Sequence, residues 1–520
     1  AQGILAQAPK SCAQPCSASR SVVGAMTSRV HAGRAVGTAM PPTQQVSGSA
    51  AGTSEGSRSS AVLSVATLLK NMIGAGIFSL PIGLRLATPM PGLMILGSIG
   101  IMSAVSYWMV GYCCIAWNVT SFRSLWHRTL GSSTAWIIDI TILGNGCFTL
   151  VGYLVLIGDF TTKSFGGLLG EDHLLARSRI LDQWVITVVL LLPLSLAEDL
   201  RRLAFTSVLG LGVTVYVVLL VLRDSWLNSP SEWGPNMVLC EWRMSAFEAV
   251  ALYTHAFVAH YNAPKLYAEL ERPTALRWLV VVLVAYGIAF FVYASFAWAG
   301  LHRFEEAVEG NVLRNLPSQN SVLTAWLGMA FSIAFTYPIV FNSAREACVN
   351  LMSPIQESIL ASPRLQRLIA SPRSQFSLGR RSISLYNVLG PRPDKPLSKG
   401  KNTATTVVIV VLTAAVASVC TDIGLVNALA GSVMGCAVAF VFPSILFYKT
   451  VRIQLGDACS ADDSLDSPLL GPFKAKHTVA QASAAARPFL KLSLGVACFI
   501  MVAGTCFGVL GAIIALRTEH

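Results

Sequence analysis

The feature that most constrains this chain is the arrangement of its apolar residues in long, separate blocks. Hydrophobic residues make up 53% of the 520 residues and charged residues only 12%, whereas a soluble domain carries about 25% charged residues. A block of about 20 apolar residues is what a helix needs to cross a bilayer. We count about eleven such blocks, at approximately Ala61–Ala87, Gly92–Trp117, Trp136–Phe160, Leu181–Ala197, Leu203–Leu222, Ala246–Pro264, Trp278–Leu301, Leu323–Phe341, Thr405–Val419, Gly424–Tyr448 and Leu490–Leu516. The sequence therefore predicts an all-α polytopic membrane protein with about eleven transmembrane helices.

Charge and cysteine usage argue against several other classes of protein. The net charge is +12, but the Lys and Arg residues sit between the apolar blocks and form no basic stripe interleaved with aromatic residues. The 12 cysteines show no metal-ligand spacing, and no nucleophile elbow or phosphate-binding loop is present. We therefore expect no enzymatic activity, no cofactor, no resident metal and no nucleic-acid partner.

Polar stretches divide the membrane core. Residues 1–60 are rich in Ser, Ala, Gly, Gln and Arg, which is typical of a disordered cytoplasmic tail, with an organelle targeting segment as the alternative. The basic stretch 343–403 and the stretch 451–488 read as cytoplasmic loops. Transmembrane helices 1–8 are expected within 61–342, helices 9 and 10 within 404–450, and helix 11 within 489–516.

The basic residues also predict an orientation. With the N-terminus in the cytoplasm, roughly 27 of the Lys and Arg residues fall on the cytoplasmic side, as the positive-inside rule favours. The largest group lies in 343–402. We expect an integral membrane protein with a cytoplasmic N-terminus, and the sequence leaves open a vacuolar or lysosomal membrane, the plasma membrane or a plastid envelope.

The first candidate site is Lys70–Pro81, which reads KNMIGAGIFSLP. It puts two glycines and a proline inside an apolar block, where both residue types weaken a helix. Irregular backbone is tolerated at this depth only where protein or a water-filled cavity covers it, and freed N–H groups could then hold a carboxylate. Equally, the glycines fit a close contact between two helices.

The second candidate site is Thr254–Pro264, which reads THAFVAHYNAP and carries polar groups and a proline in the sixth block. If the first five helices are followed by an inverted repeat of five helices, the first and sixth blocks occupy equivalent positions in the two repeats. Interrupted helices at matching places in two halves are typical of a transporter site.

Few ionisable groups lie inside the blocks, and each is a candidate for ion coupling because such groups are costly in lipid. A His residue near neutrality could carry a proton, whereas a Lys or Asp near a block end could simply reach the interface. These groups are Lys70, Asp139, Asp159, Glu248, His255 and His260.

At these segments the chain resembles the amino acid/auxin permease family. That family includes sodium-coupled neutral amino acid transporters, proton-assisted amino acid transporters and vacuolar transporters. The resemblance covers about Ser60–Phe341 and Thr405–Thr450. It rests on six motifs in the family's order, at Leu68–Pro81, Val151–Phe160, Pro193–Gly210, His255–Thr274, Tyr337–Arg345 and Thr421–Lys449.

The resemblance implies a LeuT-type fold, with two inverted repeats of five helices and one further helix. It also implies that the broken first and sixth helices bind an amino acid. The implied substrate-binding residues are Asn71, Gly74, Ala75, Gly76, Ile77, Thr254 and Phe257.

The resemblance favours a proton over sodium as the coupling ion. Thr336 matches a sodium-ligand position of the sodium-coupled members. Their Asn ligand, however, is replaced here by Lys70, as in the proton-assisted members, with Asn71 one step later. An ammonium at that place could substitute for sodium. The ion-coupling candidates are therefore Lys70, Thr336, His255 and His260, with Thr336 and Asn71 as sodium ligands if sodium is the ion.

These observations together predict a secondary active amino acid transporter that works by cation symport and alternating access. Its expected partners are a small amino acid substrate and the lipid bilayer. Two alternatives stay open: a sodium-coupled neutral amino acid symporter, and a membrane amino acid sensor that signals through its cytoplasmic tails. A sensor would bind the amino acid without accumulating it.

Overall fold

The computed structural model describes residues 59–196, 204–235, 237–360, 375–377, 382–384, 399–460 and 478–517. The expected tail 1–60 lies outside these residues except for Ser59 and Ser60. The main helices are α1 (Ala61–Met72), α2 (Leu80–Ala87), α3 (Pro89–Trp117), α4 (Phe122–Leu130), α5 (Ala135–Leu169), α6 (Leu174–Arg177), α7 (Arg179–Ile186), α8 (Leu192–Leu196), α9 (Ala204–Asn228), α10 (Ala246–Phe257), α11 (Ala263–Glu269), α12 (Ala275–Phe304), α13 (Asn320–Leu360), α16 (Lys399–Val419), α17 (Ile423–Leu429), α18 (Phe442–Ser460) and α19 (Thr478–Arg517).

Short 3₁₀ and π segments join or interrupt these helices. The 3₁₀ segments are η1 (Ala75–Ser79), η2 (Ser132–Thr134), η5 (His260–Asn262), η6 (Glu305–Ala307) and η7 (Val312–Arg314). The π segments are η3 (Thr187–Leu191), η9 (Ala430–Gly435) and η10 (Ala437–Val441). Two short antiparallel strands, β1 (Gln375–Ser377) and β2 (Ser382–Ser384), lie between α13 and α16.

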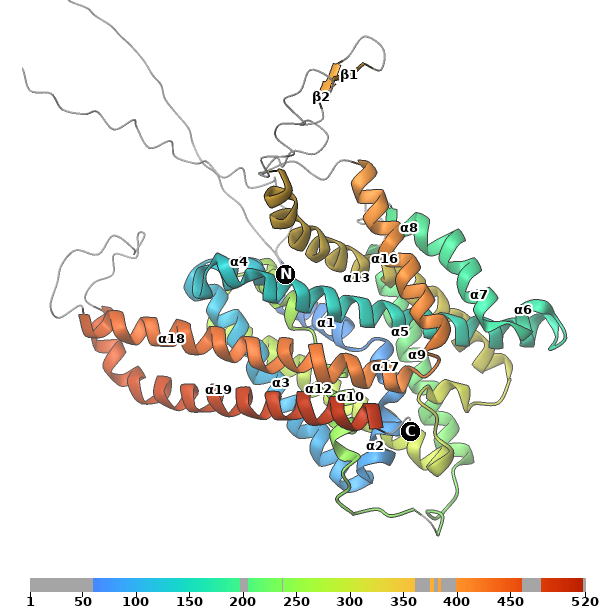
Figure 1. The fold of residues 1–520 in the computed structure, drawn as a ribbon. Coiled ribbons are helices and arrows are strands. Elements are labelled where there is room, and N and C mark those ends of the chain that lie inside the picture. Colours follow the sequence, from blue (N-terminus) through green and yellow to red (C-terminus); the bar gives the residue numbers. More distant parts are fainter. Residues whose placement is uncertain are drawn as a thin grey trace, which may run out of the picture. The chain divides into compact units, whose positions relative to one another are not determined.

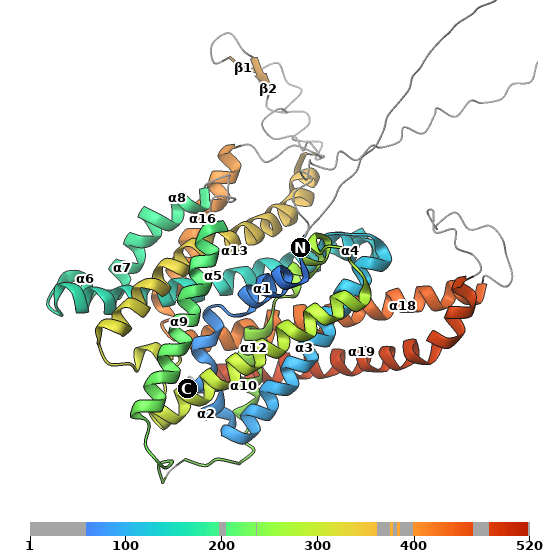
Figure 2. The same ribbon diagram turned by 180° about the vertical axis from the view of Figure 1, so that it is seen from behind.

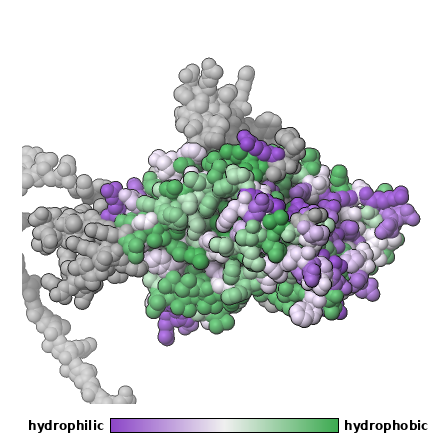
Figure 3. Space-filling view, turned by 90° about the horizontal axis from the view of Figure 1, so that it is seen from below, coloured by the Kyte–Doolittle hydropathy of each residue, from purple (hydrophilic) through white to green (hydrophobic). Residues whose placement is uncertain are grey.

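The long helices have the length and composition of membrane spans. Within the described ranges, nine helices are long and apolar enough to cross a membrane, and the bent pair formed by α1 and η1–α2 raises this number to ten. Figure 3 shows broad hydrophobic areas on one face of the molecule, with hydrophilic side chains gathered mainly toward one edge. The predicted all-α polytopic fold class is confirmed.

The expected number of about eleven spans is not confirmed, and the difference lies at the sixth block. There the chain forms α10, of 12 residues, and α11, of 7 residues, separated by a break. Neither piece alone is long enough to cross a bilayer. The first block is broken too, with a bend of 52° between its two helices. The first and sixth blocks are therefore both interrupted, as the family resemblance implied.

The two broken segments lie among the long helices (Figures 1 and 2). α10 packs against α2, α3, α19 and η9, and α12 packs against α1, α2, α3 and α9. α5 and α13 pack along each other, and α18 and α19 run side by side in both views. We call the side of the bundle where α1 begins the proximal face, and the side where α2 ends the distal face.

A buried carboxylate ties three helices together near the start of α5. Asp139 on α5 forms an ion pair with Arg123 on α4 and accepts a hydrogen bond from Asn350 on α13 at 3.4 Å. Its side chain is almost fully buried, whereas that of Arg123 is 41% exposed. Asp139 therefore anchors helices in this structure.

Candidate functional site

The first break begins where α1 ends at Met72. The Ile73 N–H donates to the Leu69 carbonyl at 2.7 Å, and the Gly74 N–H turns back to the Met72 carbonyl at 2.9 Å. The chain then enters η1, so the N–H groups of Ala75 and Gly76 have no carbonyl behind them in a helix. In the described part of the chain these two groups donate to no acceptor. They can therefore bind an anionic group.

The second break begins where α10 ends at Phe257. Val258 and Ala259 leave the helix, and Pro264, near the start of α11, has no N–H with which to continue the ladder. The carbonyls of Ala256 and Phe257 instead accept hydrogen bonds from α12. The Tyr293 hydroxyl lies 2.8 Å from the Ala256 oxygen, and Tyr286 donates to the Phe257 oxygen at 3.3 Å.

The two breaks meet. A Cβ added at Gly76 would lie 3.4 Å from the Ala256 Cα atom and 3.5 Å from the His255 Cδ2 atom. The glycine therefore lets η1 approach the end of α10 closely. The Tyr293 hydroxyl also lies 2.6 Å from the Met72 oxygen, so one side chain touches the ends of both broken helices.

A third segment holds the first break from the side of α17. Asn427 on α17 donates to the Ser79 hydroxyl at 2.8 Å, and Ser79 in turn donates to the Gly76 carbonyl at 3.2 Å. Both side chains are buried. This chain of hydrogen bonds fixes the backbone beside the free N–H groups.

The structure brings most of the predicted substrate-binding residues to this junction. Ala75, Gly76 and Ile77 are buried in η1, and Gly74 is partly exposed at its start. The buried Phe257 ring stacks on Tyr286 and meets Tyr293 edge-on at 5.0 Å between ring centroids. Thr254 is buried, and its hydroxyl donates to the Val250 carbonyl of its own helix at 2.8 Å.

The predicted ion-coupling residues are not gathered at one point. Lys70 and Asn71 lie partly buried in the last turn of α1, and in the described ranges Lys70 forms no ion pair. His255 adjoins Gly76, and its Nδ1 atom is buried without a partner there. His260 lies against α3, with Nε2 at 2.9 Å from the Ser106 hydroxyl.

Thr336 lies on α13, whose main packing partners are α5 and α9. Its hydroxyl donates to the Ser332 carbonyl of the same helix at 2.8 Å. The hydrogen of this hydroxyl is therefore committed, while its oxygen keeps a lone pair. Thr336 thus retains the capacity to accept a cation, but no contact of its side chain with α1 is recorded for the described residues.

A segment that the sequence did not single out closes the distal side of the junction. We call residues 305–316, between α12 and α13, the lid. It begins at Glu305, a non-glycine residue with a φ of 47°, and it buries Val308, Val312 and Leu313. Its η7 turn packs on η1. The lid therefore covers the first break.

Polar contacts attach the lid to α5 and α2. Asn311 donates from Nδ2 to Asp159 on α5 at 3.2 Å, and Asp159 also pairs with Arg179 on α7 at 2.9 Å. Arg85 on α2 donates to the Glu306 carbonyl at 2.6 Å. On α5 every residue from Leu150 to Thr161 is buried. The distal side is thus closed in this structure.

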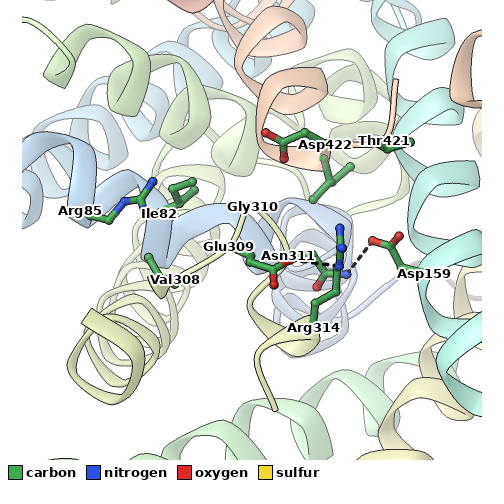
Figure 4. Close-up of a pocket in the computed structure, with 11 residues that line it drawn as sticks. Ile82, Arg85, Asp159, Val308, Glu309, Gly310, Asn311, Arg314, Thr421 and Asp422 are labelled. Atoms are coloured by element: carbon green, nitrogen blue, oxygen red, sulfur yellow. Dashed lines mark hydrogen bonds and ion pairs between the residues drawn. The ribbon is translucent and has the colours of Figure 1, made fainter. Parts of the chain in front are cut away.

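A small polar pocket is lined by the lid together with residues of α2, α5 and the start of α17 (Figure 4). Its volume is about 250 Å³, and charged side chains of both signs line it. Figure 4 shows the Asn311 and Asp159 side chains facing each other at its edge. The pocket is lined by Ile82, Arg85, Asp159, Val308, Glu309, Gly310, Asn311, Arg314, Thr421, Asp422 and Ile423.

Sequence reasoning missed Tyr286, Tyr293 and Asn311. The two tyrosines lie seven residues apart, which places them on the same face of α12, and this spacing was the available signal. No signal in the sequence pointed to Asn311, because its partner Asp159 lies 152 residues away along the chain.

Comparison with known proteins identifies the family. The family described as "Transmembrane amino acid transporter protein" matches residues 57–458. The putative sodium-coupled neutral amino acid transporter 11 of Danio rerio is 24% identical over 390 residues, which cover 73% of this chain and 77% of that protein. Vacuolar amino acid transporter 2 of Saccharomyces cerevisiae is 22% identical over 307 residues, or 57% of this chain and 63% of that protein.

Among solved structures, the inward facing conformation of Mhp1 is similar at a TM-score of 0.49 and 13% identity, covering 89% of this chain and 91% of that chain. MhsT in complex with L-phenylalanine is similar at a TM-score of 0.48 and 12% identity, covering 86% of this chain and 98% of that chain. Because the family match spans most of the sequence, this chain belongs to the transmembrane amino acid transporter family.

Proposed function

We propose that this protein is a secondary active transporter that carries an amino acid together with a proton, by alternating access around the two helix breaks. The observation that carries the proposal is the meeting of η1 with the end of α10. The free N–H groups of Ala75 and Gly76 suit the substrate carboxylate. The helix ends that face them present carbonyl oxygens with partial negative charge, which suit an ammonium group.

Lys70 supports the choice of a proton. It lies at the C-terminal end of α1, where a positive charge is favoured by the helix dipole. It is partly buried and has no carboxylate partner in the part of the chain that the structure describes. The Lys70 side chain is positively charged when protonated and neutral after it loses its proton. Lys70 can therefore carry the coupling proton through the transport cycle.

Sodium coupling is the second candidate. It is supported by the similarity to the Danio rerio relative, a putative sodium-coupled neutral amino acid transporter. It would use Asn71 and Thr336, which place an amide and a hydroxyl oxygen on α1 and α13. The two candidates differ in which gradient drives accumulation.

Uptake into proteoliposomes tests the proposal. Radiolabelled neutral amino acids are supplied under an imposed proton gradient or an imposed sodium gradient. We expect accumulation with protons alone, and its loss in Lys70→Asn. Lys265→Asn is the matched control, because Lys265 is an exposed lysine on α11. Accumulation that only sodium drives would refute proton coupling. Saturable binding without accumulation under either gradient would refute transport and favour a sensor.

We also propose that the proximal face lies in the cytoplasm, in the vacuolar or lysosomal membrane or the plasma membrane. The excess of Lys and Arg that the sequence assigns to the side of the N-terminus supports this orientation. The distal lid would then face the outside or the lumen. Labelling of the exposed Cys240, which lies between α9 and α10, with a membrane-impermeant maleimide tests it in intact vesicles of known orientation. Labelling from the cytoplasmic side would invert the assignment.

A further inference from the structure

The Tyr293 hydroxyl lies between two carbonyl oxygens that end two different helices. It is 2.6 Å from the Met72 oxygen at the end of α1 and 2.8 Å from the Ala256 oxygen at the end of α10. The side chain is fully buried and held by its edge-on contact with Phe257. Three oxygen atoms therefore converge at the junction of the two breaks.

The Tyr293 hydroxyl supplies a single hydrogen between the two carbonyl oxygens, because a tyrosine hydroxyl can donate only once. The Met72 oxygen already accepts the Gly74 N–H at 2.9 Å, while in the described ranges the Ala256 oxygen has no other donor. Both oxygens carry the partial negative charge of a helix C-terminus. Such an arrangement needs positive charge or a hydrogen to hold it together, and carbonyls at the ends of interrupted membrane helices bind sodium for this reason.

We propose that the Tyr293 hydroxyl takes the place of a monovalent cation at this junction, and that Tyr293 is the positioning residue that joins the two broken helices without sodium. The hydroxyl group hydrogen bonds to one helix end and fills the space that an ion would occupy between both. The inference rests on the proposed function, because it explains how the substrate junction closes in a transporter that is not driven by sodium.

Tyr286 provides a matched control on the same helix. Its ring is buried and stacks on Phe257, and its hydroxyl donates to a carbonyl at the end of α10. It contacts only one helix end, however, because no bond from Tyr286 to α1 is recorded in the described residues. Removal of its hydroxyl should therefore weaken α10 packing without creating a place for a cation.

The experiment compares the thermal unfolding of wild type, Tyr293→Phe and Tyr286→Phe in nanodiscs. Each protein is heated in sodium, potassium or choline chloride at equal ionic strength, without amino acid. For Tyr293→Phe in choline we expect an unfolding midpoint below that of wild type. Replacing choline by sodium should raise the midpoint of this variant by about 5 °C. For Tyr286→Phe we expect the same loss in all three salts. Binding of ²²Na⁺ by Tyr293→Phe, and not by Tyr286→Phe, would support the proposal further.

Equal behaviour of the two variants in every salt would overturn the proposal. If Tyr293→Phe cannot be recovered folded, the wild-type protein decides the question. A sodium-specific rise of the wild-type midpoint that persists in Thr336→Val would show that a cation binds despite the hydroxyl, and would overturn the proposal. No rise, or a rise lost in Thr336→Val, supports it. These measurements need no transport, so failure of the proposed function would appear separately, as absence of wild-type uptake.

Discussion

Replacement of Asn311 by Ala should release the lid. The Asn311 side chain is 2% exposed, and it donates to the Asp159 carboxylate at 3.2 Å. A hydrogen bond to a charged group contributes about 1.5–3 kcal/mol, and each 1.4 kcal/mol is about a tenfold change in an equilibrium. The population with an open lid should therefore rise about 10- to 100-fold.

Hydrogen exchange measured by mass spectrometry in nanodiscs can detect this opening. The N–H groups of Ala75 and Gly76 donate to no acceptor in the described part of the chain, so their exchange is governed by access of water alone. We expect exchange in the lid and in η1 to accelerate by the same factor, because η7 covers η1. Faster exchange in the lid alone would mean local fraying.

Asn315→Ala is the matched control for this substitution. Asn315 belongs to the same lid, but among the described residues its side chain bonds only within it, to the Ala307 carbonyl at 2.8 Å and the Glu309 N–H at 2.9 Å. Its loss should loosen the lid internally and leave the attachment to Asp159 in place. If exchange in η1 were no faster in Asn311→Ala than in Asn315→Ala, the Asn311–Asp159 bond would not hold the lid closed.

Two further substitutions test the packing of the core. Gly111→Ala should lower the folded yield strongly, because the added methyl group would collide with the Trp278 indole. The control Gly287→Ala should leave the folded yield unchanged, because a Cβ at Gly287 meets open space. Size-exclusion profiles of the two variants would show the difference. Asp139→Asn should lower stability by about 1–3 kcal/mol, since the buried carboxylate loses its charge beside Arg123; an unchanged thermal midpoint would contradict its anchoring role.

The breaks themselves could be predicted from the sequence, because their causes are local. Gly74, Gly76 and Pro81 disrupt the first apolar block, and Pro264 disrupts the sixth. The number of spans was harder to predict, since hydropathy counts the sixth block as one helix, whereas the chain divides it into α10 and α11.

The contacts that hold the breaks together could not be predicted. Tyr293 and Met72 are 221 residues apart along the chain, and a single sequence holds no record of such a pairing. The same limit applies to Asn427 and Ser79, which are 348 residues apart. The local sequence therefore predicted where the two helix breaks lie. The long-range contacts that close the candidate site could be seen only in the structure.

The last helix has a consequence for the membrane itself. The apolar part of α19, Leu492–Arg517, is 26 residues long, and 22% of its most apolar window is buried in the protein. At about 1.5 Å per residue it exceeds a hydrocarbon core of about 30 Å. α19 must therefore tilt, or the surrounding acyl chains must stretch to match it. The acyl-chain length of the lipids is thus a variable that acts directly on α19, most of whose apolar window is not buried in the protein.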